Sequence, residues 1–242
     1  MKKYFEQLYN KSSNEFYKKI EKDLKDNKKT FIVTANPETF MKAKNDEQIH
    51  NMLIDKNVVK VPDGIAIVKV ANWLGYNIKE RIAGIDIAVK LLEYGNKDKK
   101  SIFLFGAKEE VICALKKKIS IEYPNLKIVG SQNGYVKDKD EIFKDIIRMK
   151  PDIVLVALGI PIQEKLIYQY LEKFDKGIFV GVGGSFDVIS GTKKRAPKIF
   201  IKLNLEWFYR IACEPTRIKR FYDSNVKFIF KALKKSNRNS SN

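Results

Sequence analysis

The feature that most constrains this chain is a regular alternation between short apolar runs and longer segments of helical period. Between most of the runs, apolar residues recur every three or four positions, as in Glu109–Tyr123 and Glu141–Met149. Strands that alternate with helices form a mainly parallel sheet covered on both faces. The sequence therefore predicts an α/β, Rossmann-like fold whose strands include Phe31–Ala35, Val58–Val61, Ile102–Phe105, Lys127–Val129, Ile153–Leu158 and Ile178–Val182.

The alternation stops near the C-terminus. Beyond Pro197, apolar and aromatic residues such as Leu203, Trp207 and Phe228 are interleaved with Lys and Arg at helical spacing. A chain of 242 residues is long enough for one sizeable core and an appendage, but short for two full domains. We therefore expect an α/β core over residues 1–194 and a helical appendage over residues 195–242. The last seven residues, rich in Ser and Asn, are expected to fray.

Positive charge is concentrated in this tail. The whole chain carries a formal charge of +18, and residues 193–242 hold fourteen basic against three acidic residues. Such an excess indicates a phosphate-rich partner. The residues leave three interpretations open: a helix lying on anionic lipid, a nucleic-acid-binding surface that stacks bases on Trp207, Tyr209 and Phe221, or an appendage packed on the core with a solvated basic face.

Several classes of chemistry are disfavoured by the scarcity of His and Cys. His50 is the only histidine, and the two cysteines, Cys113 and Cys213, fall inside apolar helical patterns, where we expect reduced packing residues. Serine-triad and zinc sites are therefore close to excluded. Asp138 and Asp140 match the Asp-x-Asp pattern that often holds a divalent metal, but their place at a helix start among lysines favours capping, so no metal site is expected.

Other segments give broader expectations. No uncharged apolar run approaches the roughly 18 residues of a spanning helix, and the N-terminus lacks a signal-peptide core, so we expect a cytoplasmic protein. The first 30 residues predict one or two amphipathic helices, and Glu38–Leu53 predicts another helix. A dinucleotide-dependent oxidoreductase is disfavoured because no Gly-x-Gly-x-x-Gly turn follows the first strand.

Small and polar residues follow the predicted strands, where ligands bind in open parallel sheets. Asp63 follows Pro62 at a strand end, so its carboxylate is either exposed at the edge of the sheet or part of an ordinary turn. Thr34 and Asn36 end another strand and either orient a ligand hydroxyl or cap the next helix. These alternatives stay open on the residues alone.

Phosphate-binding groups are expected at two further places. Gly183, Gly184 and Ser185 join a strand to a helix start, where free N–H groups favour an anion, although such turns also serve close packing. Asp187 follows one turn later and either accepts from a nucleoside or complements the helix dipole. Arg81 is either a bidentate clamp for a pyrophosphate or a surface arginine.

Taken together, these segments resemble the WecG/TagA/CpsF family of glycosyltransferases over about residues 30–231. No single segment is specific, but their order and spacing are. The resemblance rests on Thr34-Ala-Asn36-Pro37-Glu38, Pro62-Asp63-Gly64, Arg81-Ile-Ala-Gly84, Ala157-Leu-Gly159 with Gln163-Glu164, Gly181–Asp187, Arg195-Ala-Pro197, Leu205–Arg210 and Glu214-Pro215 with Arg217 and Arg220.

The resemblance implies transfer of an N-acetylmannosamine-type sugar from a UDP donor to undecaprenyl-diphosphate-linked N-acetylglucosamine, with inversion and without metal or cofactor. It implies a protein docked by its appendage on the inner face of the membrane, with no nucleic-acid partner and with self-association left open. Its catalytic base falls on Asp63, aided by Thr34 and Arg81. Its substrate-binding residues fall on Asn36, Gln163, Gly183, Gly184, Ser185, Asp187, Arg210, Arg217 and Arg220.

Overall fold

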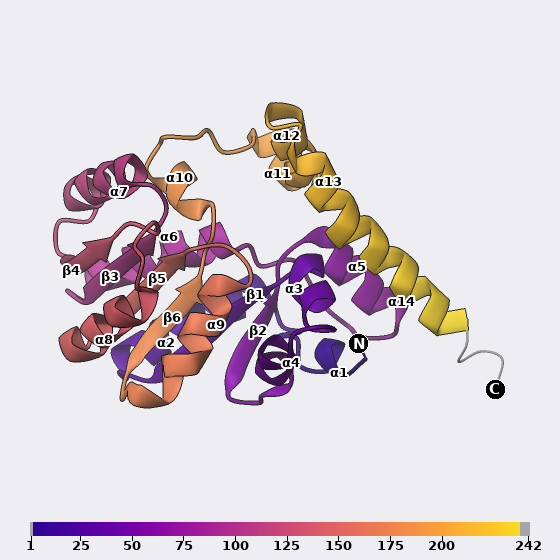
Figure 1. Ribbon diagram of the computed structural model, residues 1–242, viewed down its shortest axis with the longest axis horizontal. Helices are drawn as coiled ribbons and strands as arrows, with labels where there is room; N and C mark the ends of the chain where they lie inside the picture. The colour runs from indigo at the N-terminus through magenta and orange to yellow at the C-terminus, as the bar shows by residue number, and fades with distance from the viewer. Residues whose placement is uncertain (1, 238–242) are drawn as a thin grey trace.

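The computed structural model describes residues 2–237 and contains one six-stranded sheet (Figure 1). All strand pairs are parallel, in the order β2-β1-β6-β5-β3-β4. Each of the six predicted strands is confirmed, and the α/β, Rossmann-like prediction is correct. The strands are β1 (Lys29–Ala35), β2 (Val58–Pro62), β3 (Ser101–Gly106), β4 (Lys127–Gln132), β5 (Ile153–Ala157) and β6 (Gly177–Gly181).

Helices cover both faces of the sheet because its central strands are apolar on both sides. In β1, Phe31 and Val33 pack into one apolar cluster while Ile32 packs into the other. The face that includes Ile32 is covered by α2 (Ser13–Lys25), α6 (Gly84–Lys97), α7 (Glu109–Glu122) and α10 (Ser185–Ile189). The opposite face is covered by α1 (Lys2–Phe5), α3 (Pro37–Lys42), α4 (Glu47–Ile54), α5 (Ile65–Trp73), α8 (Lys139–Met149), α9 (Ile162–Tyr170) with the 3-10 turn Leu171–Lys173, and part of the appendage.

Two sequence predictions are wrong in detail. The single helix expected over Glu38–Leu53 is two helices, α3 and α4, because Asp46 caps a new N-terminus by accepting the Ile49 N–H at 3.3 Å. The cysteines are free as expected, but both are exposed rather than packed. In α7 the buried positions belong to residues such as Leu115, which leaves Cys113 on the solvent side.

The appendage consists of short helices that end in a longer one, α14. Its elements are α11 (Lys198–Lys202), α12 (Glu206–Cys213), α13 (Arg217–Phe221), the π-helical turn Tyr222–Val226 and α14 (Lys227–Asn237). Figure 1 shows α11 and α12 at the top of the molecule and α14 descending beside α5. Of the terminal residues expected to fray, 238–242 lie outside the described part of the chain.

One aromatic side chain fastens α14 to the core. Phe228 is fully buried, with its ring centroid 6.2 Å from that of Phe5 and 5.9 Å from that of Phe40. Other apolar side chains of the appendage are exposed, namely those of Ile199, Leu203, Phe208, Ile218 and Phe230. The appendage therefore packs on the core through Phe228 and presents apolar side chains to solvent at other positions. Among residues 2–237, no helix is both long and apolar enough to cross a membrane.

The burial of Phe228 predicts that two alanine substitutions in α14 will differ in their effect on stability. Phe228→Ala should lower the free energy of unfolding by about 3–5 kcal/mol, since it leaves a cavity among aromatic rings. The matched control is Phe230→Ala in the same helix, where the side chain is 67% exposed and little change is expected. Urea unfolding of both variants measures the difference, and equal effects would contradict this packing.

Candidate active site

Asp63 lies at the edge of the sheet where the strands end. It follows β2 directly, and its N–H donates to the carbonyl of Ala35 at the end of β1, at 2.9 Å. Gly64 has a φ of 107°, a conformation that glycine adopts without strain and that turns the chain away from the strand. The Gly84 N–H at the start of α6 donates to Asp63 Oδ2 at 3.4 Å. The carboxylate is therefore fixed near a helix N-terminus and is half-buried rather than exposed as expected.

A buried carboxylate from the appendage joins two arginines beside Asp63. Arg81 Nη2 lies 2.8 Å from Glu206 Oε2, and Arg210 Nη2 lies 2.6 Å from Glu206 Oε1. Glu206 is 5% exposed. Arg81 comes from the segment before α6, whereas both other residues belong to α12. The appendage thus contributes charged groups directly to the neighbourhood of Asp63.

The charges around Asp63 oppose one another. Burial raises the pKa of Asp63 above its usual value, although the positive charges of Arg81 and Arg210 and the Gly84 N–H act to lower it. The negative charge of Glu206 raises the pKa of Asp63 further. Burial alone would also raise the pKa of Glu206, but its two arginines outweigh this effect, and its pKa lies below the usual value. The surroundings therefore favour the ionised form of Glu206, whereas burial makes Asp63 more basic than an ordinary aspartate.

Thr34 and Asn36 have different structural roles. The Thr34 hydroxyl is buried and donates to the Gly181 carbonyl at 3.3 Å, which joins β1 to β6. Its methyl group lies so near Gly84 that a Cβ there would approach it to 3.1 Å. Asn36 Oδ1 caps α3 by accepting the Thr39 N–H at 3.0 Å, as the capping alternative predicted. Thr34 thus supports the loops on which Asp63 depends.

Gln163 connects two loops at the same edge. Its Oε1 accepts the N–H groups of Gly159 at 3.0 Å and Gly183 at 3.1 Å. A side chain at Gly181 would collide with Gln163, since a Cβ there would lie 2.6 Å from its Nε2. Gln163 is 2% exposed, so in this arrangement its side chain bonds to other protein groups and is not accessible at the surface.

The expected anion site after β6 has fewer free N–H groups than the sequence suggested. Two of its three N–H groups have protein partners, because Gly183 donates to Gln163 and Ser185 donates to the Val182 carbonyl at 3.1 Å. The Ser185 hydroxyl donates to the same carbonyl at 2.7 Å. Within the described residues, Gly184 keeps an N–H without a partner.

The remaining predicted residues are held by ion pairs. Asp187 lies 3.8 Å from Lys193 Nζ, which is 2.7 Å from Glu214. Arg217 pairs with Glu214 at 2.6 Å. Arg220 pairs with Glu38 of α3 at 2.9 Å. Of the three predicted arginines of the appendage, the structure places Arg210 in the charged cluster next to Asp63 and pairs the other two elsewhere.

Comparison with known proteins identifies the family of this chain. A family model described as "Glycosyl transferase WecG/TagA/CpsF family" matches residues 6–242. The chain belongs to this glycosyltransferase family. It is 47% identical to a Bacillus subtilis (strain 168) protein over 84% of this chain and 78% of that protein.

Two further relatives of this glycosyltransferase are similar over comparable lengths. A Bacillus spizizenii protein is 40% identical over 87% of this chain and 81% of its own length. A Staphylococcus aureus (strain NCTC 8325) protein is 37% identical over 84% of this chain and 80% of its own length. All three relatives are named N-acetylglucosaminyldiphosphoundecaprenol N-acetyl-beta-D-mannosaminyltransferase.

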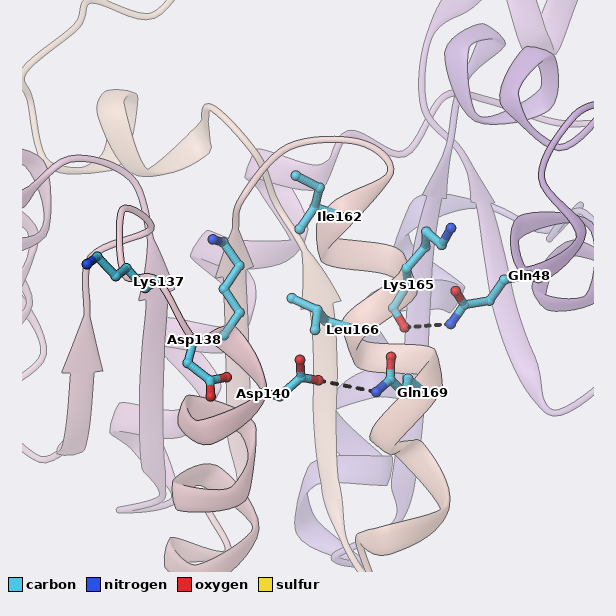
Figure 2. A pocket seen from close by; sticks show the side chains of 9 residues that line it. Gln48, Lys137, Asp138, Asp140, Ile162, Lys165, Leu166 and Gln169 are labelled. Carbon is cyan, nitrogen blue, oxygen red and sulfur yellow. Dashed lines mark hydrogen bonds between the residues drawn. The ribbon is translucent and has the colours of Figure 1, made fainter.

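A separate groove of about 520 Å³ on this glycosyltransferase lies between α8 and α9 (Figure 2). Its lining includes Gln48, Asp138, Asp140 and Lys165, and none of the predicted site residues. Asp138 caps α8 through the Glu141 N–H at 3.0 Å, as predicted, and Asp140 accepts from Tyr170 and Gln169. Among residues 2–237, no group of three or more His, Cys, Asp or Glu side chains could hold a metal ion.

Sequence reasoning missed Glu206 and Glu164 as individual residues. Glu206 lies four residues before Arg210 on one helix, and this spacing could have indicated the pair. Glu164 is 1% exposed, its Oε1 accepts from Gln163 at 2.7 Å, and its Oε2 has no hydrogen-bond partner. Burial raises the pKa of Glu164 to about 7.

The raised pKa of Glu164 predicts how stability depends on pH. The folded protein holds a proton there that the unfolded chain releases above its usual pKa of about 4.5, so stability falls as pH rises from about 4.5 to 7. Glu164→Gln removes this penalty. Its unfolding free energy relative to the native chain should therefore increase between pH 5 and pH 8 by up to about 3 kcal/mol.

Urea unfolding at several pH values measures this difference. The matched control is Glu172→Gln, because that side chain is 86% exposed in its pair with Lys29. Its unfolding free energy relative to the native chain should stay nearly constant with pH. A constant difference for Glu164→Gln as well would contradict a buried, proton-binding Glu164.

Proposed function

We propose that this glycosyltransferase moves an N-acetylmannosamine-type sugar from UDP to undecaprenyl-diphosphate-linked N-acetylglucosamine, in teichoic acid or surface polysaccharide synthesis. The relatives named for this reaction are 37–47% identical over 84–87% of the chain, which supports the donor and acceptor classes. The observation that carries the proposal is the half-buried Asp63 beside two guanidinium groups. This combination supplies a base and a cationic site for a diphosphate.

The proposed transfer is a single displacement with inversion. Asp63 accepts the proton of the acceptor hydroxyl as the hydroxyl oxygen attacks the anomeric carbon of the sugar. The new bond forms on the face opposite the departing UDP, and the bond between the anomeric carbon and the phosphate oxygen breaks. Charge then develops on the diphosphate, where Arg81 and Arg210 stabilise it without a metal.

The other predicted residues complete the proposed site. Within the described residues, the Asn36 NH2 group has no protein partner, so it is suited to donate to a sugar hydroxyl. Gly184 offers an N–H to the phosphate, and Asp187 is half-buried one turn further on, where it is suited to accept from the nucleoside. Thr34 and Gln163 act by holding the loops that carry these groups. Arg217 and Arg220 would reach the diphosphate by exchanging their present carboxylate partners.

The appendage suits a membrane surface on which a lipid-linked acceptor lies. It presents exposed apolar side chains, such as those of Leu203 and Ile218 at 61% and 62% exposure, among many lysines and arginines. Apolar groups of this kind enter the headgroup region while cations meet anionic lipid. We therefore propose that the protein works on the inner face of the cell membrane. The nucleic-acid alternative loses support because the rings of Trp207 and Phe221 stack on each other, with centroids 4.5 Å apart.

The role of Asp63 predicts a specific loss of activity. Asp63→Asn keeps the shape of the side chain but removes its basicity, so kcat/KM for UDP release should fall by roughly 10²–10⁴-fold. The assay uses UDP-N-acetylmannosamine and a short-chain polyprenyl-diphosphate N-acetylglucosamine acceptor.

Two controls accompany this assay. Asp138→Asn, which retains a capping side chain at α8, should keep full activity. Turnover of the native chain should persist in excess EDTA if the diphosphate is neutralised by arginine alone. Full activity of Asp63→Asn would rule out Asp63 as the base.

Membrane docking predicts a second, separable effect. Replacing Phe208 and Ile218 by serine should weaken binding to phosphatidylglycerol vesicles by roughly tenfold or more, since each loses about 1.5–3 kcal/mol of apolar burial. The control is Ile121→Ser, because Ile121 is 80% exposed on α7 of the core. Sedimentation with vesicles measures the binding. Equal binding by all three proteins would contradict docking through the appendage.

A further inference from the structure

The charged cluster beside Asp63 contains one residue to which the proposed reaction gives no role. Glu206 lies at the start of α12 and is almost fully buried, yet it carries a negative charge next to a site that must bind an anionic diphosphate. A buried charge is costly unless it is paired and hydrogen-bonded. Its retention therefore requires a structural or chemical reason.

The geometry of Glu206 supplies that reason. Each carboxylate oxygen binds a different guanidinium, with Oε2 facing Arg81 at 2.8 Å and Oε1 facing Arg210 at 2.6 Å. Arg81 is tied to the core, since the N–H of the next residue, Ile82, donates to the Pro62 carbonyl at 2.9 Å. Arg210 belongs to the appendage. Glu206 thus holds the arginine of the core and the arginine of the appendage next to each other.

Among residues 2–237, the pairing with Glu206 leaves most N–H donors of each guanidinium without a protein partner. A guanidinium has five N–H donors, and within the described residues each arginine makes one side-chain hydrogen bond, to Glu206. The Arg210 side chain is 47% exposed, whereas that of Arg81 is 14% exposed. Glu206 therefore orients both cations and leaves most of their donors unpaired in the described part of the chain, and Arg210 is the more accessible of the two.

We propose that Glu206 is a positioning residue, which holds Arg81 and Arg210 together and sets the balance of charge around Asp63. This inference rests on the proposed transferase function of Asp63. The charged groups that act most strongly on Asp63 are Arg81 from the segment before α6 and Arg210 and Glu206 from α12. The two cations alone would favour a weakly basic Asp63, and the carboxylate between them offsets part of their charge.

The test compares Glu206→Gln with the native chain in pH profiles of kcat/KM for UDP release. Glutamine keeps the size of the side chain but lacks the charge, so both arginines should act more strongly on Asp63. The amide oxygen of glutamine can still accept from one arginine, so the cluster stays in place and the acid limb of the profile should move to lower pH. We expect kcat to fall by roughly a hundredfold, because the other guanidinium loses the carboxylate oxygen that orients it. Glu206→Asp should keep the acid limb near its native position.

If Glu206 has a purely structural role, Glu206→Gln should move the acid limb in the opposite direction. If the substitution only releases the appendage, Arg210 leaves Asp63 and the acid limb moves to higher pH. That result, or an unmoved acid limb, would overturn the proposal. The control is Glu172→Gln, which removes an exposed carboxylate in another ion pair and should leave the profile unchanged.

A second readout separates this inference from the proposed function. Titration of the Asp63 carboxyl by carbon NMR needs no substrate, and its pKa should be lower in Glu206→Gln than in the native full-length chain. A native chain that releases no UDP would reject the proposed function alone. An Asp63 pKa that stays constant or rises in Glu206→Gln would reject the positioning role, whatever the chain transfers.

Discussion

The site depends on one buried ion-pair cluster, in which Glu206 bridges Arg81 and Arg210 beside Asp63. Glu206 and Arg81 are largely buried, so water screens their interaction poorly, whereas the Arg210 side chain is 47% exposed. Burial also makes the cluster costly to break, because removing one partner leaves an unpaired charge. The appendage therefore has a defined position over the edge of the sheet and is not a loosely attached tail.

The parallel sheet provides the frame for this cluster. Its strands end at one edge, where β1, β2, β5 and β6 deliver Thr34, Asp63, Gln163 and Gly183 from distant parts of the sequence. Buried hydrogen bonds from Thr34 and Gln163 fix the loops to one another. The appendage then closes over this edge, fastened by Phe228 at one end and by Glu206 at the other. The core and the appendage thus share one set of charges.

The fold could be predicted because its central strands are buried on both faces and are continuous apolar runs in the sequence. The break between α3 and α4 was missed because a single capping side chain, Asp46, decides it. Asp63 was placed at the edge of the sheet by its position after a strand. The role of Glu206 could not be predicted, because its contact with Arg81 spans 125 residues of sequence and forms only when the appendage packs on the core. The same holds for Gly183, whose N–H is occupied by a side chain twenty residues earlier.

A crystal structure of the full chain with UDP tests the central claim most directly, since it locates the diphosphate relative to the cluster. We predict a diphosphate in contact with the free N–H groups of Arg81 and Arg210, on the side of the cluster that faces Asp63. A diphosphate bound in the groove between α8 and α9, against Lys137 and Lys165, would contradict it. So would a diphosphate at the edge of the sheet that touches neither arginine.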